Sequence, residues 1–154
     1  MKNSAVTRPT LRQAIAEDEA FVLSLEHAYL RSHASKGQRL MRPGIGDEFP
    51  GNCSVIQTNG VDVGCLMVGE EPGVIQIDQF HIIPSARRQG IGRFILEQLV
   101  AKANETSAKL RINLFATTAS VAFFERAGFE VTLKTPNRFT MEWRGHPNGQ
   151  ATDC

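Results

Sequence analysis

The strongest constraint on the fold is a strand that ends at a proline and passes through a glycine- and arginine-rich junction into a helix. Residues 74–83 (VIQIDQFHII) form a β-type run, and Pro84 stops it because proline cannot donate a hydrogen bond to a sheet. The junction 87–93 (RRQGIGR) follows, and apolar residues then recur with a helical period over 91–105. A strand joined to a helix in this way is typical of a sheet that is covered by helices.

Helical and strand patterns alternate along the rest of the chain. Apolar spacing predicts a helix near 17–31, which Asp18 can cap, and a shorter helix near 119–127, which Gly128 is suited to end. The other predicted strands are 53–57 and 61–68, which form a hairpin around Asn59–Gly60, then 110–115, and a closing pair at 129–133 and 138–143. The segments together predict an α/β (α+β) fold with one mixed sheet and helices on its faces.

The strand 74–83 contains a change of phase. Ile75 and Ile77 share one face, whereas Phe80 and Ile82 have the opposite parity. Such a shift indicates a β-bulge near Asp78–Gln79. A strand buried on both faces gives the same pattern without a bulge, so both interpretations stay open.

Length and composition predict one domain over residues 1–154, with a core of about 8–144 and a flexible tail at 145–154. Seventeen Lys and Arg against sixteen Asp and Glu give a net charge of +1, which argues against a nucleic-acid-binding module. No apolar run approaches the roughly 18–20 residues of a membrane helix, and the polar start is unlike a secretory signal. We therefore expect a cytoplasmic protein with no membrane partner.

The three cysteines, Cys53, Cys65 and Cys154, are odd in number and widely separated. This spacing indicates neither a disulfide framework nor a metal site. Cys53 and Cys65 fall inside predicted strands, so we interpret them as packing residues and not as nucleophiles.

The junction 87–93 has the chemistry of an anion-binding site. The first turn of a helix presents backbone N–H groups without intrahelical partners, and its dipole attracts negative charge. Gly90 and Gly92 allow a ligand to approach the backbone, and the arginines of the junction can donate charge-assisted hydrogen bonds to phosphates. The alternative is a surface turn with solvated arginines. Ile95 breaks the dinucleotide fingerprint, and no Lys-Ser/Thr pair follows Gly92 as a P-loop requires.

The remaining pattern, R-x-x-G-x-G after a strand that ends in proline, resembles the acetyl-coenzyme A pyrophosphate loop of the GNAT superfamily of N-acetyltransferases. The resemblance covers roughly residues 8–144 and rests on FHIIPSARRQGIGRFILEQL, on ATTASVAFFERAGFEV downstream and on the ending NRFTMEW. It implies a mainly antiparallel sheet of about seven strands with about four helices. Two of those strands would splay apart, and the pantetheine arm of acetyl-coenzyme A would enter between them.

The resemblance also implies which residues hold acetyl-coenzyme A, with no metal. Backbone groups of one strand would meet the pantetheine and thioester, the junction would hold the diphosphate, and the second motif would complete the site. These residues are, in that order, His81, Ile82 and Ile83; Arg87, Arg88, Gln89, Gly90, Ile91, Gly92 and Arg93; and Thr117, Ser120 and Phe124. A bulge in 74–83 would open the strand pair and direct an amide toward the thioester carbonyl as an oxyanion donor.

The second motif departs from the family pattern at the position of a catalytic acid. Thr117, Ser120 and Phe124 stand where relatives carry Asn, Ala and Tyr. That Tyr often protonates the departing thiolate, and Phe124 cannot, so we interpret Phe124 as a packing residue. The one tyrosine of the chain, Tyr29, lies on the predicted first helix, far from this motif in sequence.

A general base must remove a proton from the acceptor amine. Glu48 and His81 are the first candidates: Glu48 lies on the segment 32–51, which borders the acceptor pocket in relatives, and His81 lies on the splayed strand. His81 would be only structural if its side chain faced away from the ligand. Weaker candidates, on the same segments or on the first helix, are Asp47, Asp78, His27 and His33.

The sequence therefore predicts an acetyltransferase that moves an acetyl group from acetyl-coenzyme A to a primary amine of a small molecule or peptide. The amine would attack directly in a ternary complex, with no covalent enzyme intermediate. The alternative is a non-catalytic acyl-coenzyme A sensor, which the residues Thr117 and Phe124 favour. The predicted sheet has edge strands that could pair with a second copy, and homodimers are common in the family that the chain resembles, so a homodimer is compatible with the sequence.

Overall fold

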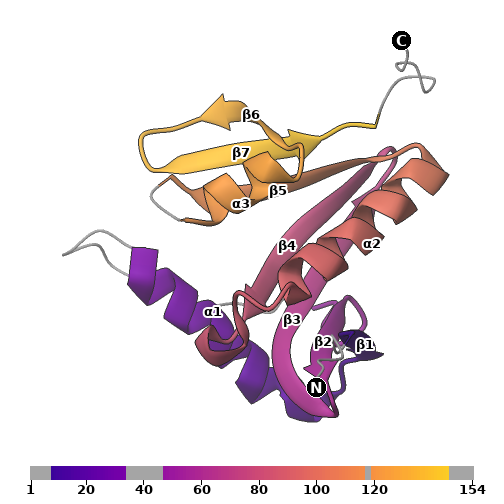
Figure 1. Ribbon diagram of the computed structural model, residues 1–154, viewed down its shortest axis with the longest axis vertical. Helices are drawn as coiled ribbons and strands as arrows, with labels where there is room; N and C mark the ends of the chain where they lie inside the picture. Colours follow the sequence, from indigo (N-terminus) through magenta and orange to yellow (C-terminus); the bar gives the residue numbers. More distant parts are fainter. Residues whose placement is uncertain (1–7, 34–46, 117–118, 146–154) are drawn as a thin grey trace, which may run out of the picture. The chain divides into compact units, whose positions relative to one another are not determined.

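The computed structural model describes residues 8–33, 47–116 and 119–145 (Figure 1). The central part of the segment 32–51 and nearly all of the predicted tail lie outside these residues. The described helices are η1 (Ala16–Asp18), α1 (Glu19–His33), η2 (Pro84–Ala86), α2 (Ile91–Thr106) and α3 (Ser120–Arg126). The described residues thus contain three α-helices and two short 3-10 helices, whereas about four helices were expected. No helix among them is long and apolar enough to cross a lipid bilayer.

Seven strands form one sheet in the order β1-β2-β3-β4-β5-β7-β6. The strands are β1 (Thr10–Gln13), β2 (Cys53–Thr58), β3 (Val61–Glu71), β4 (Val74–Ile82), β5 (Lys109–Phe115), β6 (Glu130–Lys134) and β7 (Arg138–Trp143). β4 and β5 are parallel, whereas the pairs β1–β2, β2–β3, β5–β7 and β6–β7 are antiparallel. The mixed, mainly antiparallel sheet confirms the predicted fold class.

The predicted hairpin around Asn59–Gly60 joins β2 to β3. Asn59 has φ +53° and Gly60 has φ +78°, so both turn residues adopt the left-handed conformation. Two such residues are what a type I′ turn requires, and Asn-Gly is the pair that adopts it at the lowest cost. The turn therefore sets the register in which Thr58 lies opposite Val61.

The chain divides into two compact units, residues 1–67 with 79–95 and residues 68–78 with 96–154. β3, β4 and α2 each pass from one unit into the other. The first unit has a hydrophobic cluster formed by Ala14, Val22, Cys53, Val55, Cys65 and Met67. The buried residues of the second unit include Leu110, Ile112, Leu114, Phe124, Phe129 and Met141.

The hydrogen bonds of β4 bear on the predicted β-bulge. A regular ladder that starts from a two-residue turn at Pro72–Gly73 would bring the amide of Ile82 to the carbonyl of Val63. The amide that donates to Val63 O belongs instead to Ile83, at 2.8 Å. β4 is therefore one residue out of step with β3, which is the displacement that one bulge produces.

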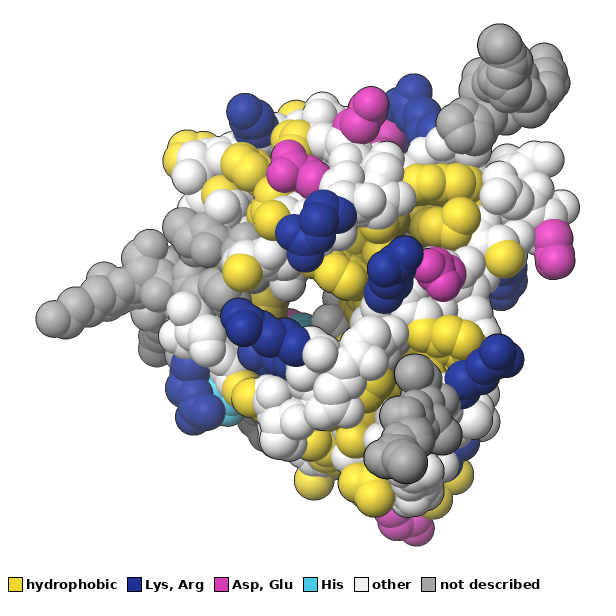
Figure 2. All heavy atoms as spheres, in the orientation of Figure 1, with side chains coloured by type: hydrophobic (Ala, Val, Ile, Leu, Met, Phe, Trp, Pro, Cys, Tyr) yellow, Lys and Arg dark blue, Asp and Glu magenta, His cyan; other side chains and the backbone are white. Residues whose placement is uncertain are grey.

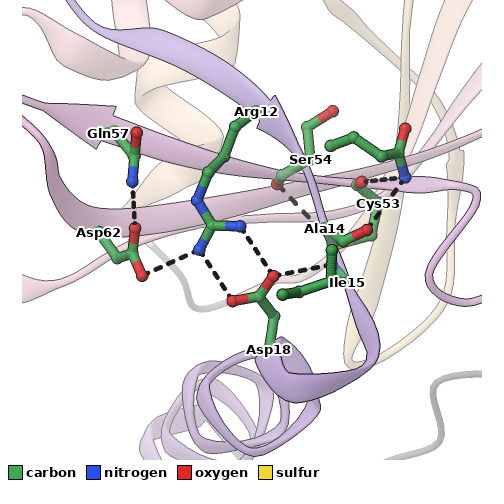
Figure 3. Close-up of polar contacts among 9 residues, drawn as sticks. Arg12, Ala14, Ile15, Asp18, Cys53, Ser54, Gln57 and Asp62 are labelled. Carbon is green, nitrogen blue, oxygen red and sulfur yellow. Dashed lines mark hydrogen bonds and ion pairs between the residues drawn. The ribbon is translucent and has the colours of Figure 1, made fainter.

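The start of α1 is tied to β1 and β3 by a charged cluster (Figure 3). Asp18 was predicted to cap the first long helix, but it caps η1 instead: its Oδ2 accepts a hydrogen bond from the amide of Ile15 at 2.8 Å. Arg12 donates to both oxygens of Asp18, at 2.9 and 2.8 Å, and to Asp62 at 3.1 Å. Gln57 completes the cluster by donating to Asp62 at 2.7 Å.

Candidate active site

The junction between β4 and α2 is a series of tight turns. The amides of Ala86 and Arg87 donate to the carbonyls of Ile83 and Pro84, at 3.0 and 3.2 Å, and close η2. Arg87 Nε then reaches back to the carbonyl of Ile82, at 2.8 Å. The side chain of Arg87 therefore fixes the end of β4, while the residue stays exposed to solvent.

Two residues of the junction adopt the left-handed backbone conformation. Arg88 has φ +63° and Gly90 has φ +82°. A Cβ at Gly90 would have nothing within 4 Å, so the conformation, and not a close contact, is what favours glycine there. A left-handed arginine is uncommon, and such backbone strain is concentrated at functional loops.

The junction ends at the first turn of α2. The carbonyl of Gly90 accepts the amide of Phe94 at 3.0 Å, so the helical ladder starts there. Ile91 is buried and anchors the turn, whereas Arg88, Gln89 and Arg93 are exposed. This arrangement leaves the amides of the first turn beside exposed guanidinium groups, as an anion site needs. Elsewhere, basic and acidic side chains are interspersed on the face shown in Figure 2.

The side chain of His81 faces α1. Its Nε2 lies 2.8 Å from Oε1 of Glu26, and the side chains are 12% and 21% exposed, respectively. The ring of Tyr29 lies 5.2 Å from the imidazole, between centroids, at an interplanar angle of 44°. His81 is thus held between a carboxylate and an aromatic ring, on the side of β4 that α1 covers.

The thiols of Cys53 and Cys65, which both belong to the first unit, have the properties of packing residues. Burial, with smaller effects from Cys53 and Glu26, raises the pKa of Cys65 to about 12. Burial likewise raises the pKa of Cys53 to about 11. A thiol that stays protonated at neutral pH is a poor nucleophile.

Two backbone groups at the end of β4, next to His81, already have hydrogen-bond partners. The amide of Ile83 donates to Val63 in β3, and the carbonyl of Ile82 accepts Arg87. Because successive residues of a strand point their N–H groups to opposite sides, the amide of Ile82 is directed away from β3.

The other candidates for the general base lie on different elements of the fold, and those whose side chains are described are exposed. Asp47 and Glu48 are exposed in a turn before β2, where the carbonyl of Glu48 accepts the amide of Asn52 at 3.2 Å. Asp78 is exposed on the part of β4 that belongs to the second unit, and His27 is exposed on α1. The side chain of His33 lies outside the described residues.

Two residues that contact His81 were not selected from the sequence. Glu26 and Tyr29 are three residues apart on α1, a spacing that places them on one face of a helix. That spacing was visible in the sequence, but nothing in it indicated that His81 would lie opposite.

The second motif forms α3. Ser120 begins the helix, and Phe124 is buried with its ring 5.1 Å from both Phe123 and Phe129, in edge-to-face contacts. Gly128, with φ +100°, follows the helix end as predicted. Phe124 therefore packs among aromatic residues, and Thr117 lies outside the described part of the chain.

Solved structures of similar fold come from several organisms, and some of them are named as acetyltransferases. Ard1 from Thermoplasma volcanium has a TM-score of 0.70 at 18% identity, over 90% of this chain and 99% of that chain. The ribosomal-protein-S18-alanine N-acetyltransferase from Escherichia coli has a TM-score of 0.68 at 18% identity, over 93% and 97%. A PaiA N-acetyltransferase from Thermoplasma acidophilum, solved with coenzyme A, has a TM-score of 0.68 at 11% identity, over 89% and 99%.

Sequence comparison with curated proteins gives no match. The model of the acetyltransferase (GNAT) family matches residues 17–129, a span that runs from η1, just before α1, to Phe129, just after α3. This span includes the strained junction, His81 with its partners and α3, and the protein therefore belongs to the GNAT family of acetyltransferases.

Proposed function

We propose that this chain, as one catalytic domain, transfers an acetyl group from acetyl-coenzyme A to a primary amine of a small molecule or peptide. The observation that carries the proposal is the left-handed, arginine-bearing junction between β4 and α2 in a chain of this family. The similar structure from T. acidophilum contains coenzyme A, and the similar enzyme from E. coli is named for a protein alanine acceptor.

The junction binds the diphosphate of the cofactor. Arg88 and Arg93 are exposed and supply positive charge, while the amides at Gly90–Gly92 supply the hydrogen bonds of a helix start. Gln89 and Ile91 shape the same turn: Gln89 Nε2 donates to the carbonyl of Ser85 at 3.2 Å, and Ile91 is buried. Thr117, Ser120 and Phe124 remain predicted cofactor residues of the second motif.

The amide of Ile82 is the oxyanion donor in this proposal. The amide of Ile83 already donates to Val63, so it cannot also bind the thioester oxygen. Ile82 directs its N–H to the other side of β4, where a carbonyl can accept it. One preorganised donor at the developing oxyanion contributes about 3–4 kcal/mol to the transition state.

His81 is the general base in this proposal, ahead of Glu48. His81 is largely buried and held by Glu26, whereas Glu48 is exposed in a turn. The amine gives its proton to His81 and attacks the acetyl carbon, and the C–S bond then breaks. Because a thiol has a pKa near 8.5, coenzyme A can leave as the thiolate without the acid that Phe124 cannot provide.

Cofactor binding by the junction is tested with Arg88→Ala and the matched control Arg31→Ala, an exposed arginine of α1. Loss of one charge-assisted contact to the diphosphate should weaken coenzyme A binding about tenfold, measured by calorimetry. Binding of acetyl-pantetheine, which lacks the diphosphate, should not change, and Arg31→Ala should leave both ligands unaffected.

Catalysis is tested by following free thiol release from acetyl-coenzyme A with a panel of amines that includes peptides. We expect release with at least one amine and acetylated amine in equal amount. Tight coenzyme A binding without release for any amine would show a non-catalytic acyl-coenzyme A protein. Absence of coenzyme A binding would overturn the whole proposal.

A further inference from the structure

The contact between Glu26 and His81 defines which nitrogen of the imidazole can accept a proton. An ionised carboxylate only accepts hydrogen bonds, so the Nε2 that lies 2.8 Å from Glu26 Oε1 carries the hydrogen. In the neutral ring the other nitrogen, Nδ1, then holds the lone pair. Glu26 therefore selects one tautomer and leaves Nδ1 as the proton acceptor.

The surroundings of His81 hold the ring in one orientation. Tyr29 contacts the imidazole from the same helix face as Glu26, one turn further along α1. The side chains of Glu26 and His81 are both mostly buried, so water competes little for their hydrogen bond. An imidazole fixed in this way loses little freedom when it meets a substrate proton.

We infer that Glu26 is the positioning residue of the acetyl transfer, and that it holds His81 with Nδ1 as the base. This inference rests on the proposed function. The proton of the amine moves to Nδ1 as the N–C bond forms, and the C–S bond breaks to release the thiolate. Glu26 stabilises the imidazolium that results, and solvent later removes the proton.

The pH dependence of the reaction follows from the groups around His81. Those that the described residues place against it are Glu26 and Tyr29 on α1 and Cys65 on β3. Burial raises the pKa of Cys65 to about 12, so the charge that acts on the imidazole is that of the Glu26 carboxylate. Removal of its negative charge favours the neutral imidazole, so the acidic limb of the rate profile should move to lower pH.

The test compares kcat, KM and their pH profiles for the wild type, Glu26→Gln, Glu26→Asp and the control Glu19→Gln. Glu19 is exposed at the start of the same helix, so its change should have no effect. Glu26→Gln should lower kcat about 10- to 100-fold, as loss of a partner that orients a functional histidine does. The acidic limb should shift, KM for acetyl-coenzyme A should stay within twofold, and Glu26→Asp should recover part of kcat.

Each outcome separates this inference from the proposed function. A wild type that acetylates no amine removes the proposed function. An active wild type with an unchanged profile in Glu26→Gln removes only the role of Glu26, as does a loss of kcat without a shift of the limb. The imidazole ¹⁵N signals of the unliganded wild type give a readout that does not depend on turnover: a neutral His81 with hydrogen on Nδ1 would overturn the inference.

Discussion

The first unit contains two charged clusters that use similar groups in different ways. In one, Arg12 donates to Asp18 and Asp62, and Gln57 donates to Asp62 as well. In the other, His81 has Glu26 as its ionisable partner and Tyr29 as an aromatic neighbour. Both clusters join a helical segment to the sheet.

The difference lies in the cation. Arginine stays protonated at every physiological pH, and each fixed hydrogen bond of Arg12 ties β1 to η1 or β3. Histidine can gain or lose its proton near neutral pH, and its second nitrogen is not used by Glu26. A cation that cannot lose its proton serves the fold, whereas one that can is suited to proton transfer. Substitutions in the His81 cluster should therefore lower the rate of the reaction, whereas substitutions in the Arg12 cluster should lower the stability of the fold.

The largest effect is expected from His81→Gln, with His27→Gln as a matched control on α1. Loss of the general base should lower kcat about 10²- to 10⁴-fold, because general base catalysis contributes that much. Coenzyme A affinity should stay the same, since His81 contributes only backbone groups to the cofactor. His27 is exposed and should be silent in the steady-state assay.

If His81→Gln kept the activity of the wild type, another residue would have to be the general base. Glu48→Gln would then be the variant to measure. Comparable losses in His81→Gln and His27→Gln would indicate a general effect on α1. Denaturation midpoints of the variants separate that effect from catalysis.

A smaller effect, on stability, is expected from Arg12→Met. Asp18 is 8% exposed and would keep only the amide of Ile15. A buried group that loses its partner costs about 1–3 kcal/mol, and partial exposure of Arg12 favours the lower half of that range. Lys102→Met, which breaks an exposed pair with Glu70, should cost under about 1 kcal/mol. Urea denaturation compares them.

Equal losses in Arg12→Met and Lys102→Met would mean that the Arg12 cluster is an ordinary surface pair. A loss of kcat in folded Arg12→Met would contradict the division between the two clusters. Both results would be obtained from the same preparations.

Much of the fold could be predicted because its signals are local. The Asn59–Gly60 turn, the stop at Pro84 and the helix end at Gly128 each depend on the backbone preferences of one or two residues. The expected number of helices was less accurate, since it came from the resemblance and the described residues hold three α-helices.

The site was harder to predict because its contacts are distant in sequence. Glu26 and His81 are 55 residues apart, and Arg12 and Asp62 are 50 apart. Periodicity shows which face of an element is apolar, but it does not show which polar side chains of two elements meet. The junction 87–93 was found because all its parts are consecutive.

The smallest effect is expected in the pH dependence of stability when Asp18, in the Arg12 cluster, is replaced by Asn. The hydrogen bond from Arg12, helped by the amide of Ile15, lowers the pKa of Asp18 below its ordinary value near 3.8 although burial opposes this. A lowered pKa stabilises the fold above the unfolded value of about 3.9, and that stabilisation is lost as pH falls through the folded pKa. Asp18→Asn cannot titrate, so its deficit in unfolding free energy should be constant near neutral pH and shrink below about pH 4.

The buried Glu142 also has a lowered pKa and contributes to acid unfolding. Burial alone would raise its pKa, but hydrogen bonds from Lys109 and Arg144 lower it. Because Glu142 is present in both proteins, its contribution cancels in the difference between wild type and Asp18→Asn. A difference that stays constant from pH 7 to pH 2 would mean that Asp18 is not stabilised by Arg12.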